Sequence, residues 1–449
     1  MQGVTLTIAI MLSVLALTLK PRHALVAYLT GLLWYPSYLA ISIGTIDIMV
    51  GRIVGLVLLL RCLSNDRIRS RFKWSKLDTW VGYSMIVYVG VTLLTRPTFS
   101  TIENRGGFIM DTWLAYMVAR FIITDKNELI SVIKCISIIL IPLAILGCME
   151  AVTGWQPFVP LRRFRPWNPV TGEAAGIKRW GFTRAVGPFS HPILFGGGFA
   201  IFLPLIYYLR YDKHWRRLAY PLSAITIVGA LSSMSSGPWI MVMVILFCLV
   251  MEKYKHWTKP MIIFLIFLCI FVEIFSNRTF YHVLASYGSM LGGAGWHRAR
   301  LIDVAIKHIG DWWLAGYGGV DPGWGHYFGM GHTDVTNEYI LAGVRYGIAG
   351  IIVLCGVLVV AFRSLISAYK KATHHSMKSL YWILGTILFS VTITWMSVSF
   401  FGQLMPLFYC VLGMIGSISG ICEPPRIRVK RVILDRKSQE YRLVQSHSL

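Results

Sequence analysis

The sequence predicts an all-α protein that crosses a membrane many times. Of its 449 residues, 55% are hydrophobic and 14% are charged, whereas roughly a quarter of the residues of a soluble domain are charged. About thirteen apolar runs approach the length of roughly 20 residues that a helix needs to cross a bilayer. We therefore expect about 12 to 13 transmembrane helices, with two long segments between them.

The apolar runs divide the chain into three groups of helices. We expect N-terminal helices within 1–149, central helices within 192–276 and C-terminal helices within 338–420. The expected spans are residues 4–19, 24–43, 46–61, 78–95, 106–123, 129–149, 192–210, 218–234, 237–252, 260–276, 338–362, 379–397 and 403–420.

The short loops rich in lysine and arginine predict the orientation. The loop 61–76 holds six such residues, and further basic residues gather in 210–217, 252–259, 363–378 and the tail 421–449. Thirteen spans place all of these on one face, which the positive-inside rule makes cytoplasmic. We expect a multi-pass membrane protein. The formal charge of +23 records topology, so no nucleic-acid partner is expected.

The long segments 150–191 and 277–337 then lie on the opposite, outer face. The first carries more cations than the topological trend predicts: Arg162, Arg163, Arg165, Lys178, Arg179 and Arg184. Arginines of a long loop are often only solvated, and for the first three this interpretation stays open. Arg184 differs because Gly187, Pro188 and Pro192 constrain the backbone beside it. Its guanidinium suggests an anionic ligand, with phosphate the natural partner.

The second long segment combines an amphipathic stretch with a loop rich in glycine and aromatic residues. Over 296–318, helical spacing puts Leu301, Val304, Ala305 and Ile309 on one face. Arg298 and Arg300 stand near the start of this stretch. Trp324 and its aromatic neighbours serve either as interfacial anchors or as stacking platforms for sugars.

Polar residues with catalytic chemistry gather in these two segments. His332, Asp334 and Glu338 are candidates for a base that takes a proton from a hydroxyl. Arg184, Arg298 and Arg300 are candidates for binding a diphosphate. His191, Asn337 and Trp324 are candidates for contacting a glycan. Simpler interpretations remain, since a loop histidine is often incidental and Asn337 and Glu338 suit a helix start.

Several chemistries lack their motifs. The sequence has no nucleotide-binding, serine-hydrolase or zinc-protease motif. The cysteines are scattered without paired spacing, and one His-Asp pair is too small a ligand set for a metal site. We expect neither a cofactor nor a metal.

Four stretches resemble a known family when taken together. They are "RAVGPFSHPILFGGGFAIFLP", "SSMSSGPW", "WHRARLIDVAIKHIGDWWLAGYG" and "TNEYILAGVRYGIAG", within roughly 180–355. In this order they resemble the superfamily of O-antigen ligases and polymerases, which includes exopolysaccharide polymerases. The resemblance implies a metal-independent membrane glycosyltransferase with a fold similar to the GT-C class. It also implies an undecaprenyl-diphosphate-linked glycan as donor, a location in the bacterial inner membrane and transfer on its periplasmic side, where the two long segments would lie.

The resemblance carries diphosphate contacts onto Arg184 and Arg298. The last family motif falls on Thr336, Asn337, Tyr339, Ile340, Gly347 and Gly350. Two positions depart from the family pattern. Thr336 stands where the family has histidine, and Ser236 stands where it often has arginine. The missing histidine favours a polymerase over a ligase.

The expected function is therefore polymerisation of undecaprenyl-diphosphate-linked repeat units for an exopolysaccharide, a capsule or O-antigen. Donor and acceptor are both lipid-linked glycans, and membrane lipid surrounds the protein. A chain-length regulator and a flippase are partners that the resemblance implies. The alternatives are a ligase that transfers glycan to lipid A core, a transporter or flippase of lipid-linked oligosaccharide, and a non-catalytic scaffold.

Overall fold

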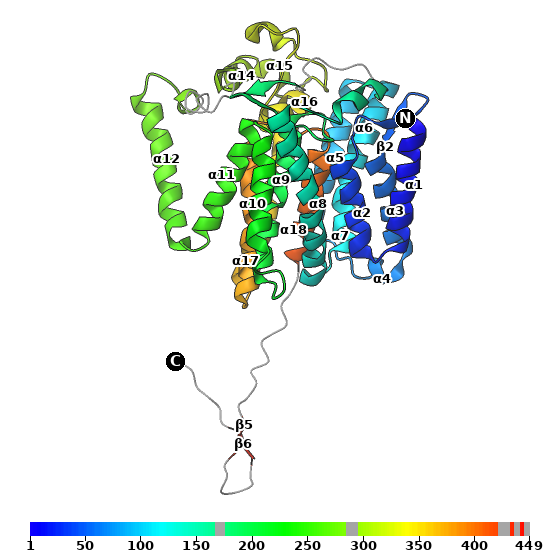
Figure 1. Ribbon diagram of the computed structural model, residues 1–449. Helices are drawn as coiled ribbons and strands as arrows, with labels where there is room; N and C mark the ends of the chain where they lie inside the picture. Colours follow the sequence, from blue (N-terminus) through cyan, green and yellow to red (C-terminus); the bar gives the residue numbers. More distant parts are fainter. Residues whose placement is uncertain (167–175, 284–294, 421–431, 435–440, 444–449) are drawn as a thin grey trace.

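The protein is a layer of long helices with a small cap across one end (Figure 1). The computed structural model describes residues 1–166, 176–283, 295–420, 432–434 and 441–443. Six described helices are long and apolar enough to cross a membrane, and four more are apolar but shorter. The expected α-helical membrane architecture is thus confirmed in outline.

The N-terminal third builds the side of the layer that carries the N-terminus and reaches into its middle (Figure 1). Its helices are α1 (Gln2–Thr18), α2 (Pro21–Trp34), α3 (Val50–Ser64), α4 (Asp66–Arg69), α5 (Lys76–Thr95), α6 (Phe99–Asp111), α7 (Trp113–Ile122) and α8 (Lys126–Thr153). An antiparallel pair of strands, β1 (Ala40–Ile43) and β2 (Ile46–Met49), lies between α2 and α3.

The rest of the chain builds the middle of the layer, its far edge and the cap. The long helices are α9 (Pro192–Tyr208), α10 (Ala219–Ser232), α11 (Ser236–Met251), α12 (Thr258–Phe275), α16 (Glu338–Lys371), α17 (His375–Thr394) and α18 (Leu404–Ile418). The cap holds α14 (Gly295–Lys307), α15 (Ile309–Trp312) and the 3-10 turn η4 (Trp324–Phe328). The remaining elements are η1 (Val159–Phe164), η2 (Leu209–Tyr211), η3 (Lys255–Trp257) and the strands β3 (Lys178–Arg179), β4 (Phe182–Thr183), β5 (Val432–Leu434) and β6 (Tyr441–Leu443).

Three expected spans contain a strand or a break in the structure. The span 46–61 begins with strand β2, and its helix α3 starts only at Val50. The span 24–43 is wrong in its second half, because α2 ends at Trp34 and a hairpin follows. Pro36 disfavours helical backbone at the residue before it, and Gly44, with φ +63°, forms the hairpin turn. The span 106–123 is interrupted at Thr112, which separates α6 from α7.

Helix α9 lies at the centre of the layer, and 89% of its membrane-spanning window is buried. A side chain at Gly196 would collide with Ser233 and Pro238, and one at Gly197 would press on Leu404. These glycines therefore let α9 approach α11 and α18 closely. The approach brings the N-terminal ends of α9 and α11 together.

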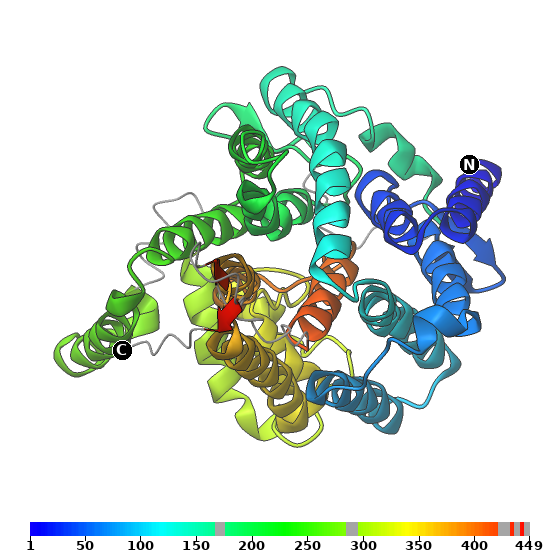
Figure 2. The ribbon, with the colours of Figure 1, turned by 90° about the horizontal axis from the view of Figure 1, so that it is seen from below.

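Helix α12 stands at the edge of the layer (Figures 1 and 2). None of its residues is buried by the rest of the chain, although its mean hydropathy is that of a membrane span. Lipid is therefore the expected surrounding of α12.

The cap has a small core of its own. Leu301, Val304 and Ala305 of α14 are buried against Trp324 and Phe328. The expected amphipathic face is confirmed for these three α14 residues. It is wrong for Ile309, which is 52% exposed, because α14 ends at Lys307 and α15 starts a new direction.

A break in α16 anchors the cap to the layer. Gly347 has φ +67° and ψ −165° inside an otherwise helical run. Beside it, Ile348 N donates to Trp313 O, and Tyr317 N donates to Val344 O, each at 2.7 Å. The chain between α15 and η4 therefore packs directly against the backbone of α16.

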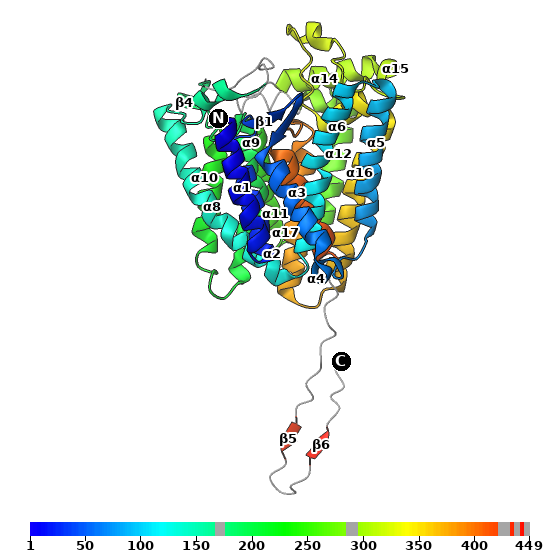
Figure 3. The ribbon, with the colours of Figure 1, turned by 90° about the vertical axis from the view of Figure 1, so that its right-hand side faces the viewer.

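The cap and the basic loops lie at opposite ends of the layer. In Figures 1 and 3, α14 and α15 are at the upper end, whereas α4, in the basic loop 61–76, is at the lower end. This arrangement agrees with the expected separation of the long segments from that loop. Which end faces the periplasm stays a prediction.

Candidate functional site

The backbone that carries Arg184 is held by a buried carboxylate. Glu150, near the end of α8, is fully buried, and its Oε2 accepts hydrogen bonds from Val186 N at 2.8 Å and Gly187 N at 3.0 Å. Gln156 Nε2 donates to Arg184 O at 2.9 Å. Gly187 has φ +50°, a conformation that glycine adopts without strain. These contacts fix where the side chain of Arg184 begins.

Two arginines from distant segments meet at the N-terminus of α11. Arg184 Nη2 donates to Ser235 Oγ at 2.6 Å, and Arg298 Nη2 donates to Ser236 Oγ at 3.3 Å. Arg184 is only 9% exposed. The free N–H groups at a helix start carry partial positive charge. The arginine pair and the α11 N-terminus therefore form one electropositive region.

A third arginine strengthens this region. Burial, and to a smaller extent the positive charge of Arg179, lower the pKa of Arg184 to about 10. Burial and Arg179 also lower the pKa of Arg298, which Asp334 partly opposes. Among the described residues, no carboxylate forms an ion pair with any of the three arginines. All three stay charged at neutral pH, so the region favours an anion.

His191 borders the arginines as a neutral side chain. It caps α9, where its Nδ1 accepts a hydrogen bond from Ile193 N at 3.1 Å. Burial first, then Arg184 and Arg162, lower the pKa of His191 to about 4. At neutral pH its Nε2 therefore carries the proton and can donate one hydrogen bond.

Asn337 and Glu338 start α16 and connect it to the segment before α18. Asn337 Oδ1 accepts from Tyr339 N and Ile340 N, and its Nδ2 donates to Met396 O at 2.9 Å. Glu338 is buried, and its Oε2 accepts from Phe400 N at 2.9 Å. Helix capping, the simpler interpretation of Asn337, thus describes its contacts.

The three candidate bases are not grouped together. Asp334 is exposed and lies close enough to Arg298 and His297 to influence the pKa of both. His332 instead acts on Asp321. Burial raises the pKa of that carboxyl, but hydrogen bonds from neighbouring residues and the charge of His332 lower it overall. Of the three, Asp334 is the one within electrostatic reach of the arginines.

Two further predicted residues point away from the arginines' region. Arg300 is exposed, whereas Arg298, two positions earlier on α14, is largely covered. A spacing of two residues puts side chains on different faces of a helix. Trp324 is 1% exposed and stacks on His308, with ring centroids 5.6 Å apart. Its ring faces are thus taken by the cap core and are not open to a glycan in this conformation.

Ser235, Ser236 and Arg179 are the residues that sequence reasoning missed. Ser236 was noted only as a position where the family that the sequence resembles often has an arginine, and Ser235 as the residue before it. Arg179 was one cation among several in its loop. Their role depends on contacts between distant segments.

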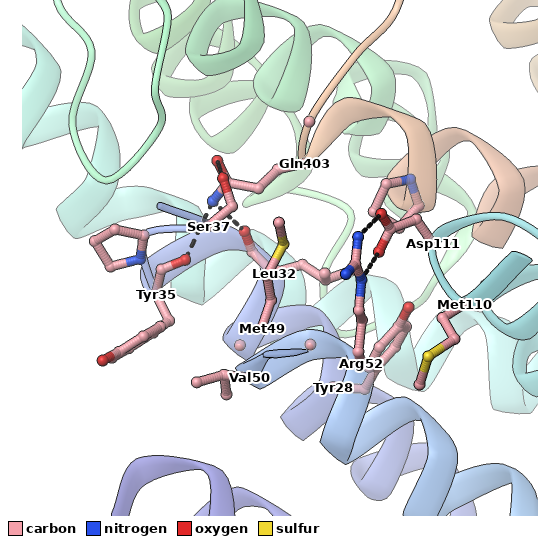
Figure 4. Close-up of a pocket in the computed structure, with 15 residues that line it drawn as sticks. Tyr28, Leu32, Tyr35, Ser37, Met49, Val50, Arg52, Met110, Asp111 and Gln403 are labelled. Atoms are coloured by element: carbon pink, nitrogen blue, oxygen red, sulfur yellow. Dashed lines mark hydrogen bonds and ion pairs between the residues drawn. The ribbon is translucent and has the colours of Figure 1, made fainter. Parts of the chain in front are cut away.

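A separate pocket opens beside α2, α3 and α18 (Figure 4). It holds about 500 Å³, partly open to solvent, and Gly402 and Gln403 line one side. Arg52 pairs with Asp111 through bonds of 2.9 and 2.7 Å across the pocket. The pair leaves little net charge there, so this pocket lacks the anion-binding character of the arginine region.

Comparisons with known proteins add no relative. No family model matches the chain, and no curated protein is similar enough to be counted as related. Within the described residues, no group of three or more His, Cys, Asp or Glu side chains is placed to hold a metal ion.

Proposed function

We propose that this protein transfers a glycan from an undecaprenyl-diphosphate carrier to a hydroxyl of a second lipid-linked glycan, at the end of the layer that carries the cap. The meeting of Arg184 and Arg298 on Ser235 and Ser236 carries this proposal. The chain would act as a polymerase of repeat units for a surface polysaccharide, with this end on the periplasmic side.

The arginine region suits a diphosphate leaving group. In the transfer, the acceptor oxygen forms a bond to the anomeric carbon of the donor sugar. The bond from that carbon to the phosphate oxygen breaks, and undecaprenyl diphosphate keeps the electron pair. Arg184 and Arg298 would stabilise this growing negative charge. Neutral His191 would donate a further hydrogen bond without competing for a proton. Direct displacement of this kind inverts the anomeric centre.

Asp334 is the favoured acceptor for the hydroxyl proton. It is the only one of the three predicted bases that is both exposed and within electrostatic reach of Arg298 among the described residues. Glu338 already accepts a backbone hydrogen bond from Phe400. A base beside a cation also keeps the acceptor hydroxyl near the departing phosphate.

Transport of lipid-linked glycan receives less support. A transporter is expected to place ionisable groups along a path at mid-membrane depth. Here Arg120 inside α7 is bound by Asp78 at 2.7 Å, and Arg52 is bound by Asp111. These charges are engaged within the fold. The arginine region lies instead at the cap end of the layer, around Ser235 and Ser236.

The test separates binding from chemistry. Binding of undecaprenyl diphosphate to the purified protein should weaken about tenfold or more in Arg184→Ala and in Arg298→Ala, because a charge-assisted contact is lost. The matched control is Arg300→Ala, on the same helix but exposed. The same two variants should lose long polysaccharide in cells and accumulate single repeat units. Unchanged binding in both arginine variants would refute the proposal, and long chains that stay on the carrier would indicate a ligase instead.

A further inference from the structure

A two-residue hairpin beside the arginine region presents an exposed tryptophan. Strands β3 and β4 pair Lys178 with Thr183 and Arg179 with Phe182, so only Trp180 and Gly181 form the turn. Both turn residues have positive φ, +50° and +84°. A two-residue turn of this kind favours Asn, Asp or Gly at its first position.

Trp180 is therefore a costly choice for the fold alone. Positive φ disfavours a bulky side chain, at a cost of about 1 to 3 kcal/mol. The ring is not used to fill the core, since Trp180 is 55% exposed. Strain of this kind, kept at an exposed residue, points to a role outside folding.

The ring of Trp180 is held next to the arginines by a second aromatic residue. Its centroid lies 5.2 Å from that of Trp239, with 35° between the ring planes. Trp239 belongs to the first turn of α11 and is fixed by a hydrogen bond from its Nε1 to Leu231 O at 3.1 Å. The same helix turn begins with Ser235 and Ser236, which bind Arg184 and Arg298.

The charge of Arg179 indicates which kind of ligand would lie beside Trp180. Arg179, directly before Trp180, lowers the pKa of both arginines through its charge and therefore lies near the place where an anion would bind. A ligand held there by phosphate would carry its next group within reach of the hairpin. An exposed indole face attracts the partly positive C–H face of a sugar ring.

We propose that Trp180, supported by Trp239, is the platform for the sugar attached directly to the diphosphate of the donor. This inference rests on the proposed function and adds a sugar subsite to it. Membrane anchoring is the competing role of an exposed tryptophan. It does not explain a strained turn position or a ring packed on Trp239.

The experiment uses two probes and one variant that the turn should tolerate. Trp180→Asn removes the ring and introduces a residue that this turn favours, so the protein should fold at least as well. The probes are undecaprenyl diphosphate and the undecaprenyl-diphosphate-linked oligosaccharides extracted from the producing strain. Trp155→Asn is the matched control. Trp155 follows the end of α8 and is 62% exposed. In the described part of the chain, its ring stacks on neither Trp239 nor the arginines.

The expected result is selective. Trp180→Asn should weaken binding of the oligosaccharide probe about 3- to 10-fold, the range of an aromatic contact, and leave undecaprenyl diphosphate binding unchanged. Trp155→Asn should change neither. Equal weakening of both probes, or no weakening of either, would overturn the sugar subsite. If Arg184→Ala and Arg298→Ala both left undecaprenyl diphosphate binding intact, the proposed function itself would fail, whatever Trp180 does.

Discussion

The guanidinium of Arg184 donates to the hydroxyl of Ser235 at 2.6 Å, across 50 intervening residues of chain. One position further, Ser236 accepts from Arg298. Neighbouring serines at one helix start thus orient two arginines from separate segments. The serine hydroxyls fix the direction of the two guanidinium groups and leave their positive charges in place. A carboxylate partner would neutralise those charges.

Ser235→Ala tests this orientation. The variant keeps the charge of Arg184 but removes its hydrogen-bond partner, so the guanidinium gains freedom. We expect glycan transfer to slow about tenfold, equivalent to about 1.4 kcal/mol. Thermal stability should change by less than about 1 kcal/mol. The measurement is the rate of polymer formation by purified protein.

Ser233→Ala is the matched control. Ser233 is buried nearby, but its hydroxyl bonds to Ala230 O and to neither arginine in the described structure. A slow Ser233→Ala variant together with an unaffected Ser235→Ala variant would show that the serine hydroxyl does not orient Arg184.

His191 makes stability depend on pH. Its pKa in the folded protein is about 4, below the ordinary value of 6.5, so the unfolded chain binds its proton first as the pH falls. His191 therefore contributes no penalty above about pH 6.5, and a growing one as the pH falls toward 4. The full loss is at most about 3 kcal/mol.

His191→Asn removes this titration and keeps an N-cap for α9. Thermal unfolding of the wild type in detergent should shift downward between pH 6.5 and 4.5 by more than that of the variant. Parallel pH profiles for the two proteins would contradict the buried, neutral state of His191.

The sequence singled out two members of the arginine region but not the contacts that they make. Arg184 was distinguished by the glycine and prolines that follow it, and Arg298 by its place before an amphipathic helix. Both lie at the arginine region. Ser235, Ser236 and Arg179 could not be found, because local patterns do not reveal which distant segments meet.

The errors have the same origin. Hydropathy read residues 24–43 as one span, since an apolar strand and an apolar helix look alike in a short run. Trp324 was a plausible sugar platform by composition, but the cap buries it. Arg300 was grouped with Arg298 by proximity in sequence, although the helix turns it outward. Packing decided each of these cases.

Glu150 should matter for folding more than for chemistry. It accepts from Val186 N and Gly187 N in a fully buried position. Glu150→Ala would leave two buried N–H groups without acceptors, at a cost of roughly 2 to 4 kcal/mol. Glu150→Gln retains an oxygen that can accept from both groups. We expect a large fall in unfolding temperature for Glu150→Ala and a small one for Glu150→Gln. Equal falls would show that the backbone at Val186 and Gly187 requires the charge of the carboxylate and not only an acceptor oxygen.

The backbone break in α16 should be intolerant of any side chain. Gly347 has φ +67°, and a Cβ there would collide with the backbone of Leu314 and Ala315. Gly347→Ala should therefore destabilise the protein by about 2 kcal/mol or more and loosen the cap, which limited proteolysis of residues near Leu314 would detect. Gly385→Ala is the control, because nothing lies within 4 Å of a Cβ at that position and alanine favours a helix interior by up to about 1 kcal/mol.

Since Arg298 belongs to the cap, Gly347→Ala should also weaken undecaprenyl diphosphate binding, whereas Gly385→Ala should leave it unchanged. Normal binding in a Gly347→Ala protein with a protease-sensitive cap would show that the arginine region forms without the cap being anchored to α16.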